Sequence, residues 1–183
     1  VIEWEGAAIL AARANGPYTV VENTAPGTSV GFAHSADPDL GDTRTYSITG
    51  GSGSGLFSIN STTGEIIQTG VINYEAASSY TLDLRVQDAG GLFDTVTVTI
   101  NITDVNETPV LNPAGPFTFA ENIAPGTVVT TMTASDQDTG QTLTYSIQGG
   151  NTNGLFAINS STGVLTFAGS PNYELQSLYN LVI

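Results

Sequence analysis

Apolar and polar residues alternate along the two most regular stretches of the chain. In the first stretch, Tyr80, Leu82, Leu84 and Val86 are separated by polar or charged residues. In the second, every other residue from 96 to 102 is valine or isoleucine. Alternation of this length indicates a β-strand with one face in a core and the other in solvent. We therefore predict strands over residues 80–87 and 95–103.

Turn signals separate the shorter apolar stretches elsewhere in the chain. Examples are Ala25-Pro26-Gly27, Gly50-Gly51 and Ala89-Gly90-Gly91, and glycine and proline are the residues that tight turns favour. No convincing stretch has the apolar spacing of an amphipathic helix. Roughly seven short strands over one hundred residues are typical of an all-β sandwich with Greek-key connections.

The motifs of residues 16–84 return 99 residues later. Glu22-Asn23 recurs as Glu121-Asn122, and Asn73-Tyr74-Glu75 recurs as Asn172-Tyr173-Glu174. About half of the aligned positions are identical, without a gap. A period near one hundred residues is the size of an immunoglobulin-like sandwich. The sequence therefore predicts two tandem immunoglobulin-like Greek-key β-sandwiches.

The limits of the two copies follow from their alignment. We expect repeat 1 over residues 16–108 and repeat 2 over residues 109–183. Repeat 2 stops at Ile183, which aligns with Leu84, so it should lack its last strand. Residues 1–15 should be the remnant of a preceding repeat or a tail. We therefore expect the chain to be a segment of a longer tandem array.

Charge and cysteine content exclude several kinds of partner. Seventeen acidic residues face three basic ones, giving a net charge of −14, which repels nucleic acid and anionic membrane surfaces. No apolar run is long enough for a transmembrane helix, so we expect no direct membrane insertion. Without cysteine, a metal site would have to use oxygen ligands or the single histidine, His34.

A short polar segment, Asp104-Val105-Asn106-Glu107-Thr108-Pro109, joins the two copies. Aspartate, asparagine and glutamate supply the hard oxygen ligands that suit Ca²⁺. Taken singly, each acidic motif is more typical of a solvated strand end or turn than of a calcium site. The recurrence of the acidic motifs in register in both copies favours calcium.

The order of the motifs resembles that of cadherin repeats, most of all the cadherin-like modules of bacterial secreted and surface adhesins. The resemblance covers nearly all of residues 16–183, and it implies an extracellular, secreted or cell-surface location. The matching motifs are Glu22-Asn23, Gly27-Thr28, Asp37-x-Asp39, Tyr46-Ser47-Ile48, Leu56-Phe57-Ser58-Ile59, Thr63-Gly64-Glu65-Ile66, Asn73-Tyr74-Glu75, Asp88 and the segment 104–109.

The resemblance implies that Ca²⁺ binds between successive repeats, with roughly two or three ions at the junction. Carried onto this chain, it implies the ligands Glu22, Asn73, Glu75, Asp104, Val105, Asn106, Glu107, Thr108, Asp136 and Asp138. Val105 and Thr108 would act through their carbonyl oxygens. Asn73 stands where the family usually has aspartate, which removes one charge. By the same resemblance, Asp37, Asp39 and Asp88 would face a preceding repeat, and Glu121, Asn172 and Glu174 a following one.

These observations favour a structural or adhesion segment stiffened by calcium, with neighbouring repeats of the same or like chains, or a cell-surface protein, as partners. Two alternatives stay open. One is a carbohydrate-binding module with a polysaccharide partner, and the other is an extracellular filament subunit completed by strand donation. We expect no enzyme and no catalytic residues, because the acidic residues have a simpler role as calcium ligands.

Overall fold

The computed structural model describes residues 18–37, 42–112 and 114–183, so the predicted remnant at residues 1–15 lies outside it. The chain divides into two compact units, Val1–Val105 and Asn106–Ile183. Each unit has its own hydrophobic core. No helix among the described residues is long and apolar enough to cross a membrane.

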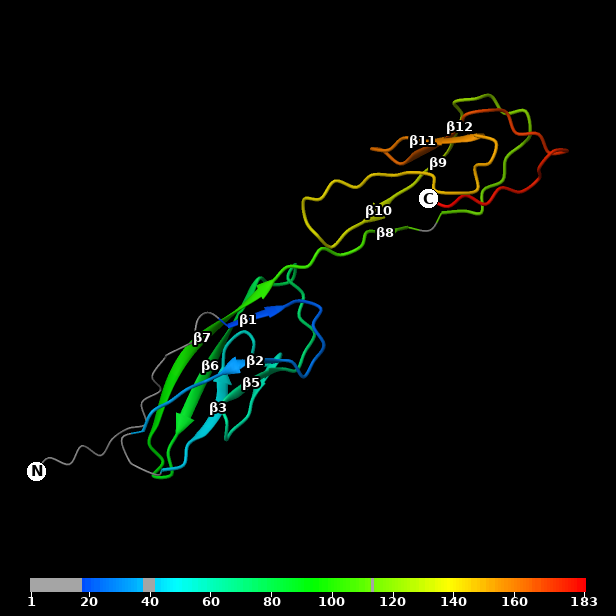
Figure 1. Ribbon diagram of the computed structural model, residues 1–183. Helices are drawn as coiled ribbons and strands as arrows, with labels where there is room; N and C mark the ends of the chain where they lie inside the picture. The colour runs from blue at the N-terminus through cyan, green and yellow to red at the C-terminus, as the bar shows by residue number, and fades with distance from the viewer. Residues whose placement is uncertain (1–17, 38–41, 113) are drawn as a thin grey trace, which may run out of the picture. The chain divides into compact units, whose positions relative to one another are not determined.

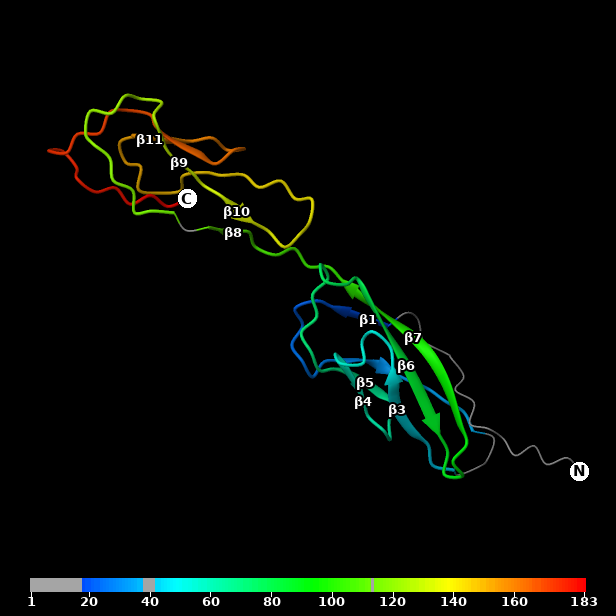
Figure 2. The same cartoon turned by 180° about the vertical axis from the view of Figure 1, so that it is seen from behind.

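Unit 1 is a sandwich of two sheets (Figures 1 and 2). One sheet has the strand order β1-β7-β6-β3 and the other has the order β2-β5-β4. β1 pairs with β7 in parallel, whereas the remaining pairs are antiparallel. The all-β prediction is confirmed. The strands are β1 (Tyr18–Val21), β2 (Ser29–Phe32), β3 (Thr45–Gly50), β4 (Phe57–Ile59), β5 (Glu65–Gln68), β6 (Ser79–Gln87) and β7 (Phe93–Thr103).

The core of unit 1 lies between these sheets. Leu82, Leu84 and Val86 of β6 are at most 1% exposed, as the alternation over residues 80–87 predicts. From the opposite sheet, Phe57 of β4 and Ile66 of β5 join the same apolar cluster. Because successive side chains of a strand point to opposite faces, one buried face fixes the register of the whole sheet.

The outer face of the four-stranded sheet is polar. Asp83 of β6 accepts a hydrogen bond of 2.6 Å from the Thr97 hydroxyl of β7. Arg85 lies over the ring of Phe93, with its guanidinium carbon 4.0 Å from the ring centroid. These contacts hold neighbouring strands together on the side that faces solvent.

Unit 2 contains the shorter set of strands β8 (Val110–Leu111), β9 (Val128–Thr131), β10 (Ala134–Ser135), β11 (Phe156–Ile158) and β12 (Val164–Phe167). The sheet β11-β12-β9 has the same arrangement as β4-β5-β2 of unit 1. Its core is strongly aromatic: the Phe119 and Phe167 ring centroids are 4.8 Å apart, and Phe156 and Tyr179 pack against them.

Unit 2 has no regular strand at the described positions that align with β1, β3 and β6. In unit 1, β1 takes its hydrogen bonds from β7, and the positions that align with β7 lie after Ile183. Only one bridge, Gly149 with Val182, corresponds to the β3–β6 pairing of unit 1. Similar sequences thus form regular strands in unit 1 and, at the described positions of unit 2, only this bridge.

Replacing Leu82 with alanine should destabilise unit 1 by about 2–5 kcal/mol, because it leaves a cavity at a site with no exposure to solvent. Thr99→Ala, at an exposed position of the adjacent strand, should change the free energy of unfolding by less than about 1 kcal/mol. Urea denaturation followed by circular dichroism measures both. Equal losses would contradict this assignment of the core.

Candidate functional site

The end of β1 carries the first predicted ligand. The strand stops at Val21, and Asn23 then adopts a left-handed conformation with φ of 55°, which asparagine tolerates better than most residues. The equivalent Asn122 of unit 2 has φ of 59°. The Asn23 N–H donates to the Ile72 carbonyl at 3.1 Å, so the turn after Glu22 is tied to the segment that precedes Asn73.

Glu22 itself is buried, with 2% of its surface exposed. Its Oε2 accepts a hydrogen bond from the Tyr74 N–H at 2.7 Å, and its Oε1 accepts one from the Val105 N–H at 2.8 Å. A buried carboxylate is unfavourable unless it is hydrogen-bonded, and here both oxygens have donors. Glu22 therefore joins the end of β1 to the segment around Tyr74 and to the residue after Asp104.

Glu22, Glu75 and Asp104 form a carboxylate cluster at this end of unit 1. Each offers a ligand oxygen, and these oxygens lie within 4.8 Å of one another. The two described arginines have contacts elsewhere, Arg44 with the Ser35 carbonyl and Arg85 with Phe93. Carboxylates this close repel one another, and hard oxygen ligands are what Ca²⁺ takes. The donor set therefore fits calcium.

Asn73 lies next to this cluster in the chain. Its Oδ1 accepts a hydrogen bond from the Ala76 N–H at 2.8 Å, which closes the turn that carries Glu75. The side chain is thus engaged in local structure, and its predicted role as a calcium ligand stays a prediction.

A second group of predicted ligands lies in unit 2. The Glu107 N–H donates to Asp138 Oδ2 at 2.8 Å, and the Asp138 N–H donates to Asp136 Oδ1 at 3.0 Å. Gln141 Nε2 donates to Asn106 Oδ1 at 2.6 Å. These bonds hold the first residues of unit 2 against the two aspartates.

The structure thus brings the predicted ligands together in two groups, one in each unit. Thr108 follows Glu107 at an exposed position. The predicted use of the Val105 and Thr108 carbonyls stays a prediction, as does the ligand set as a whole.

The opposite end of unit 1 has another carboxylate cluster, made of Asp37, Asp42 and Asp88, whose ligand oxygens also lie within 4.8 Å of one another. Asp88 Oδ1 accepts the Leu92 N–H at 2.8 Å and so closes the turn between β6 and β7. Asp39 lies outside the described residues. Sequence comparison of the repeats missed Asp42, because its aligned residue in repeat 2 is Gln141.

Unit 2 repeats the Glu22 arrangement in part. Glu121 Oε2 accepts the Tyr173 N–H at 3.2 Å, and Asn172 Oδ1 accepts the Leu175 N–H at 3.1 Å. Glu121 is exposed, and the positions that align with Asp104 and Val105 lie after Ile183. The hydrogen bonds to Glu121 and Asn172 thus repeat those of unit 1. Among the described residues around them, however, no carboxylate cluster is found.

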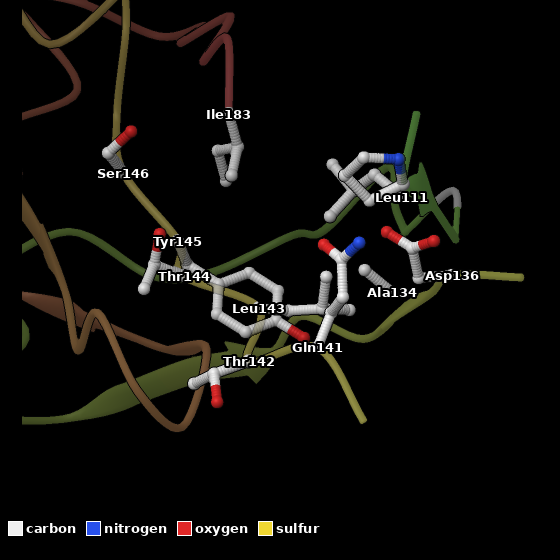
Figure 3. Close-up of a pocket in the computed structure, with 11 residues that line it drawn as sticks. Leu111, Ala134, Asp136, Gln141, Thr142, Leu143, Thr144, Tyr145, Ser146 and Ile183 are labelled. Atoms are coloured by element: carbon white, nitrogen blue, oxygen red, sulfur yellow. The ribbon is translucent and has the colours of Figure 1, made fainter. Parts of the chain in front are cut away.

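Unit 2 also has a pocket of about 350 Å³, lined by residues that include Leu111, Asp136, Tyr145 and Ile183. Figure 3 shows Asp136 at one side of this pocket, away from Ser146. Tyr145 aligns with Tyr46 of β3, which pairs with Val86 of β6. Asp136 is the single charged residue among the described residues that line the pocket, and we assign no ligand to it.

Both repeats match the family model of the cadherin domain, over residues 17–103 and 116–183. The chain belongs to the cadherin family. The resemblance to cadherin repeats is therefore confirmed for most of the sequence.

Cadherins of several animals are similar to this chain. It is 34% identical to human Protocadherin Fat 4 over 172 residues, which cover 91% of this chain and 3% of that protein. It is 33% identical to the Drosophila melanogaster Protocadherin-like wing polarity protein stan over 175 residues, which cover 90% of this chain and 5% of that protein. The chain thus spans a small part of these relatives. They are animal proteins, so the narrower resemblance to bacterial adhesins is not supported.

Solved cadherin structures have the same fold. Human Desmocollin-1 ectodomain is 30% identical, with a TM-score of 0.60 and coverage of 97% of this chain and 36% of that chain. Mouse Cadherin-23 EC22-24 is 28% identical, with a TM-score of 0.65 and coverage of 87% and 53%. This chain therefore shares the sandwich architecture of cadherin ectodomain repeats.

Replacing Glu75 with glutamine should raise the free energy of unfolding of unit 1 in EDTA, by on the order of 1 kcal/mol. The reason is that Glu75 lies within 4.8 Å of two other carboxylates and their repulsion falls when one charge is removed. Urea denaturation in EDTA at neutral pH measures the effect. A loss of stability under these conditions would contradict the repulsive cluster.

Proposed function

We propose that this chain is a calcium-stiffened adhesion or spacer segment of a larger extracellular cadherin, with Ca²⁺ bound between its two repeats. The chain consists of cadherin repeats, and its relatives are cell-surface or extracellular proteins. The observation that supports the proposal most is the cluster of Glu22, Glu75 and Asp104. Asp104 is also the first residue of the segment that joins the repeats.

The proposed mechanism is conformational. Glu22, Glu75 and Asp104 each offer one ligand oxygen to the cluster, and three oxygens are fewer than the roughly 6–8 that Ca²⁺ takes. Asn106 and Glu107 follow Asp104 directly in the chain and can supply more. Residues 104–107 would then be fixed by the same ions that neutralise the cluster.

Asp136 and Asp138 complete the proposed ligand set from the second repeat. Asp138 holds the Glu107 N–H within unit 2, just as Glu22 holds the Val105 N–H within unit 1. Each unit thus anchors one half of the joining segment. We propose that roughly two or three ions bind there, and that they fix the spacing and angle of the repeats.

The proposed partners are neighbouring repeats of the same or like chains and a cell-surface protein. No relative or solved structure reported above supports a polysaccharide partner or a filament subunit completed by strand donation. Cadherins are adhesion proteins, and we propose no catalytic role. The domain limits of 16–108 and 109–183 belong to the same proposal.

Millimolar Ca²⁺ should raise the melting temperature, because the ions bind the folded protein and not the unfolded chain. Extracellular calcium modules bind with Kd of roughly 10⁻⁴–10⁻³ M, so the melting temperature should begin to rise in that concentration range and then increase with the logarithm of the Ca²⁺ concentration. Mg²⁺ should raise the melting temperature less, since it requires a tighter octahedral geometry. Differential scanning calorimetry of the wild type in EDTA, Ca²⁺ and Mg²⁺ measures this.

Two variants make the calcium test specific. Glu75→Gln should reduce the calcium-induced rise in melting temperature, although it stabilises the protein in EDTA. Asp83→Ala is the matched control: it also removes one carboxylate, but from the polar outer face of the sheet, and it should leave the rise unchanged. Identical melting of the wild type in EDTA and in excess Ca²⁺ would exclude the site.

Small-angle X-ray scattering should give a well-defined maximum dimension with Ca²⁺ and a broader distribution of distances in EDTA. The repeats should stay folded in EDTA, because their cores are apolar and need no ion, while the joining segment loses its charge neutralisation. Asp138→Ala should shift the calcium profile towards that in EDTA. A wild-type profile that chelation does not change would refute calcium stiffening.

A further inference from the structure

One polar side chain, Gln68, is fully buried at the end of β5 in unit 1, with no exposed surface. Its Nε2 donates to two main-chain carbonyls, Thr24 at 2.9 Å and Gly70 at 3.0 Å. Its main chain makes two further hydrogen bonds to the loop that contains Thr24. The Gln68 carbonyl accepts the Gly27 N–H at 2.7 Å, and the Gln68 N–H donates to the Thr28 carbonyl at 2.9 Å.

The two carbonyls belong to the two segments that carry Glu22 and Glu75 of the carboxylate cluster. Thr24 comes two residues after Glu22, and Gly70 precedes the turn that carries Glu75. Gln68 therefore connects these segments from inside the core.

Burial of Gln68 is unfavourable in itself. Its Oε1 is buried without a hydrogen-bond partner among the described residues, and a buried acceptor left unpaired destabilises the folded state. A glutamine at this position therefore needs a reason other than core packing.

The second repeat shows that the fold does not need a glutamine here. The aligned residue is Phe167, which is 2% exposed and packs in the aromatic core. The main-chain bonds are the same: the Gly126 N–H donates to the Phe167 carbonyl at 2.7 Å, and the Phe167 N–H donates to Thr127 at 3.0 Å. What Gln68 adds is the pair of side-chain bonds to the carboxylate-bearing segments.

We propose that Gln68 is a positioning residue that holds Glu22 and Glu75 in the arrangement that binds Ca²⁺. This role rests on the proposed function, and Gln68 itself lies outside the carboxylate cluster. Without the two Nε2 bonds, the segments around Thr24 and Gly70 become more flexible. Ion binding must then order them, and this loss of conformational entropy weakens the affinity for Ca²⁺. Residues that orient metal ligands typically change metal affinity by 10–100-fold when replaced.

Gln68→Met tests the proposal, because methionine has a similar length and volume but no N–H donor. Calcium titration of the whole chain by calorimetry should show Kd about tenfold weaker than the wild type. In a Glu22→Gln background, where the cluster has already lost a carboxylate, Gln68→Met should weaken binding much less. Such coupling is expected of residues that act on the same site.

Ile66→Val is the matched control for a purely structural effect. Ile66 lies on the same strand and is equally buried, but its side chain donates no hydrogen bond to the ligand-bearing segments. This variant should lose stability and keep the wild-type calcium affinity.

Amide hydrogen exchange in EDTA gives a readout that needs no calcium. The Tyr74 and Val105 amides, which donate to Glu22, should exchange about tenfold faster in Gln68→Met and at the wild-type rate in Ile66→Val. If Gln68→Met keeps both the calcium affinity and the exchange rates of the wild type, the inference is overturned. If the wild type binds no calcium, the proposed function fails, and the role of Gln68 in binding fails with it.

Discussion

The buried carboxylate of Glu22 is the interaction on which the functional end of the first repeat depends. It accepts N–H groups from residues that are 52 and 83 positions further along the chain. Since burying a carboxylate is strongly unfavourable without such donors, its burial favours the structure in which the ends of β1 and β7 and the turn before Glu75 come together. The other two carboxylates of the cluster are placed by the same closure, and so is the start of the segment that leads into the second repeat.

The sequence allowed much of this architecture to be predicted, for a physical reason. Antiparallel sheets with one solvated face show apolar residues at every second position, and β6 and β7 follow that rule. The paired acidic motifs were recognised because they recur at one spacing. The regularity of the second repeat was not predictable in the same way: the described residues that align with β1 and β3 have similar sequences but form no regular strand.

Other features lay outside what patterns can show. A polar residue in a strand is normally expected on the solvent face, yet Gln68 lies on the same buried face of β5 as Ile66. The carbonyls of Thr24 and Gly70 accept the hydrogen bonds of its amide there. Asp42 was missed because it belongs neither to the motifs that recur in both repeats nor to the motifs of the family resemblance. Both cases depend on contacts between segments far apart in sequence, which a periodic pattern does not contain.

The parallel pairing of β1 with β7, from Tyr18 opposite Ile100 to Val21 opposite Thr103, has a mechanical consequence. The chain enters the first repeat at the beginning of β1 and leaves it at the end of β7, so tension between the two ends pulls the paired strands in opposite directions along their axes. The hydrogen bonds between them are then loaded together in shear rather than opened one after another. The repeat is thus built to resist stretching at the very pair of strands through which a pulling force enters and leaves it.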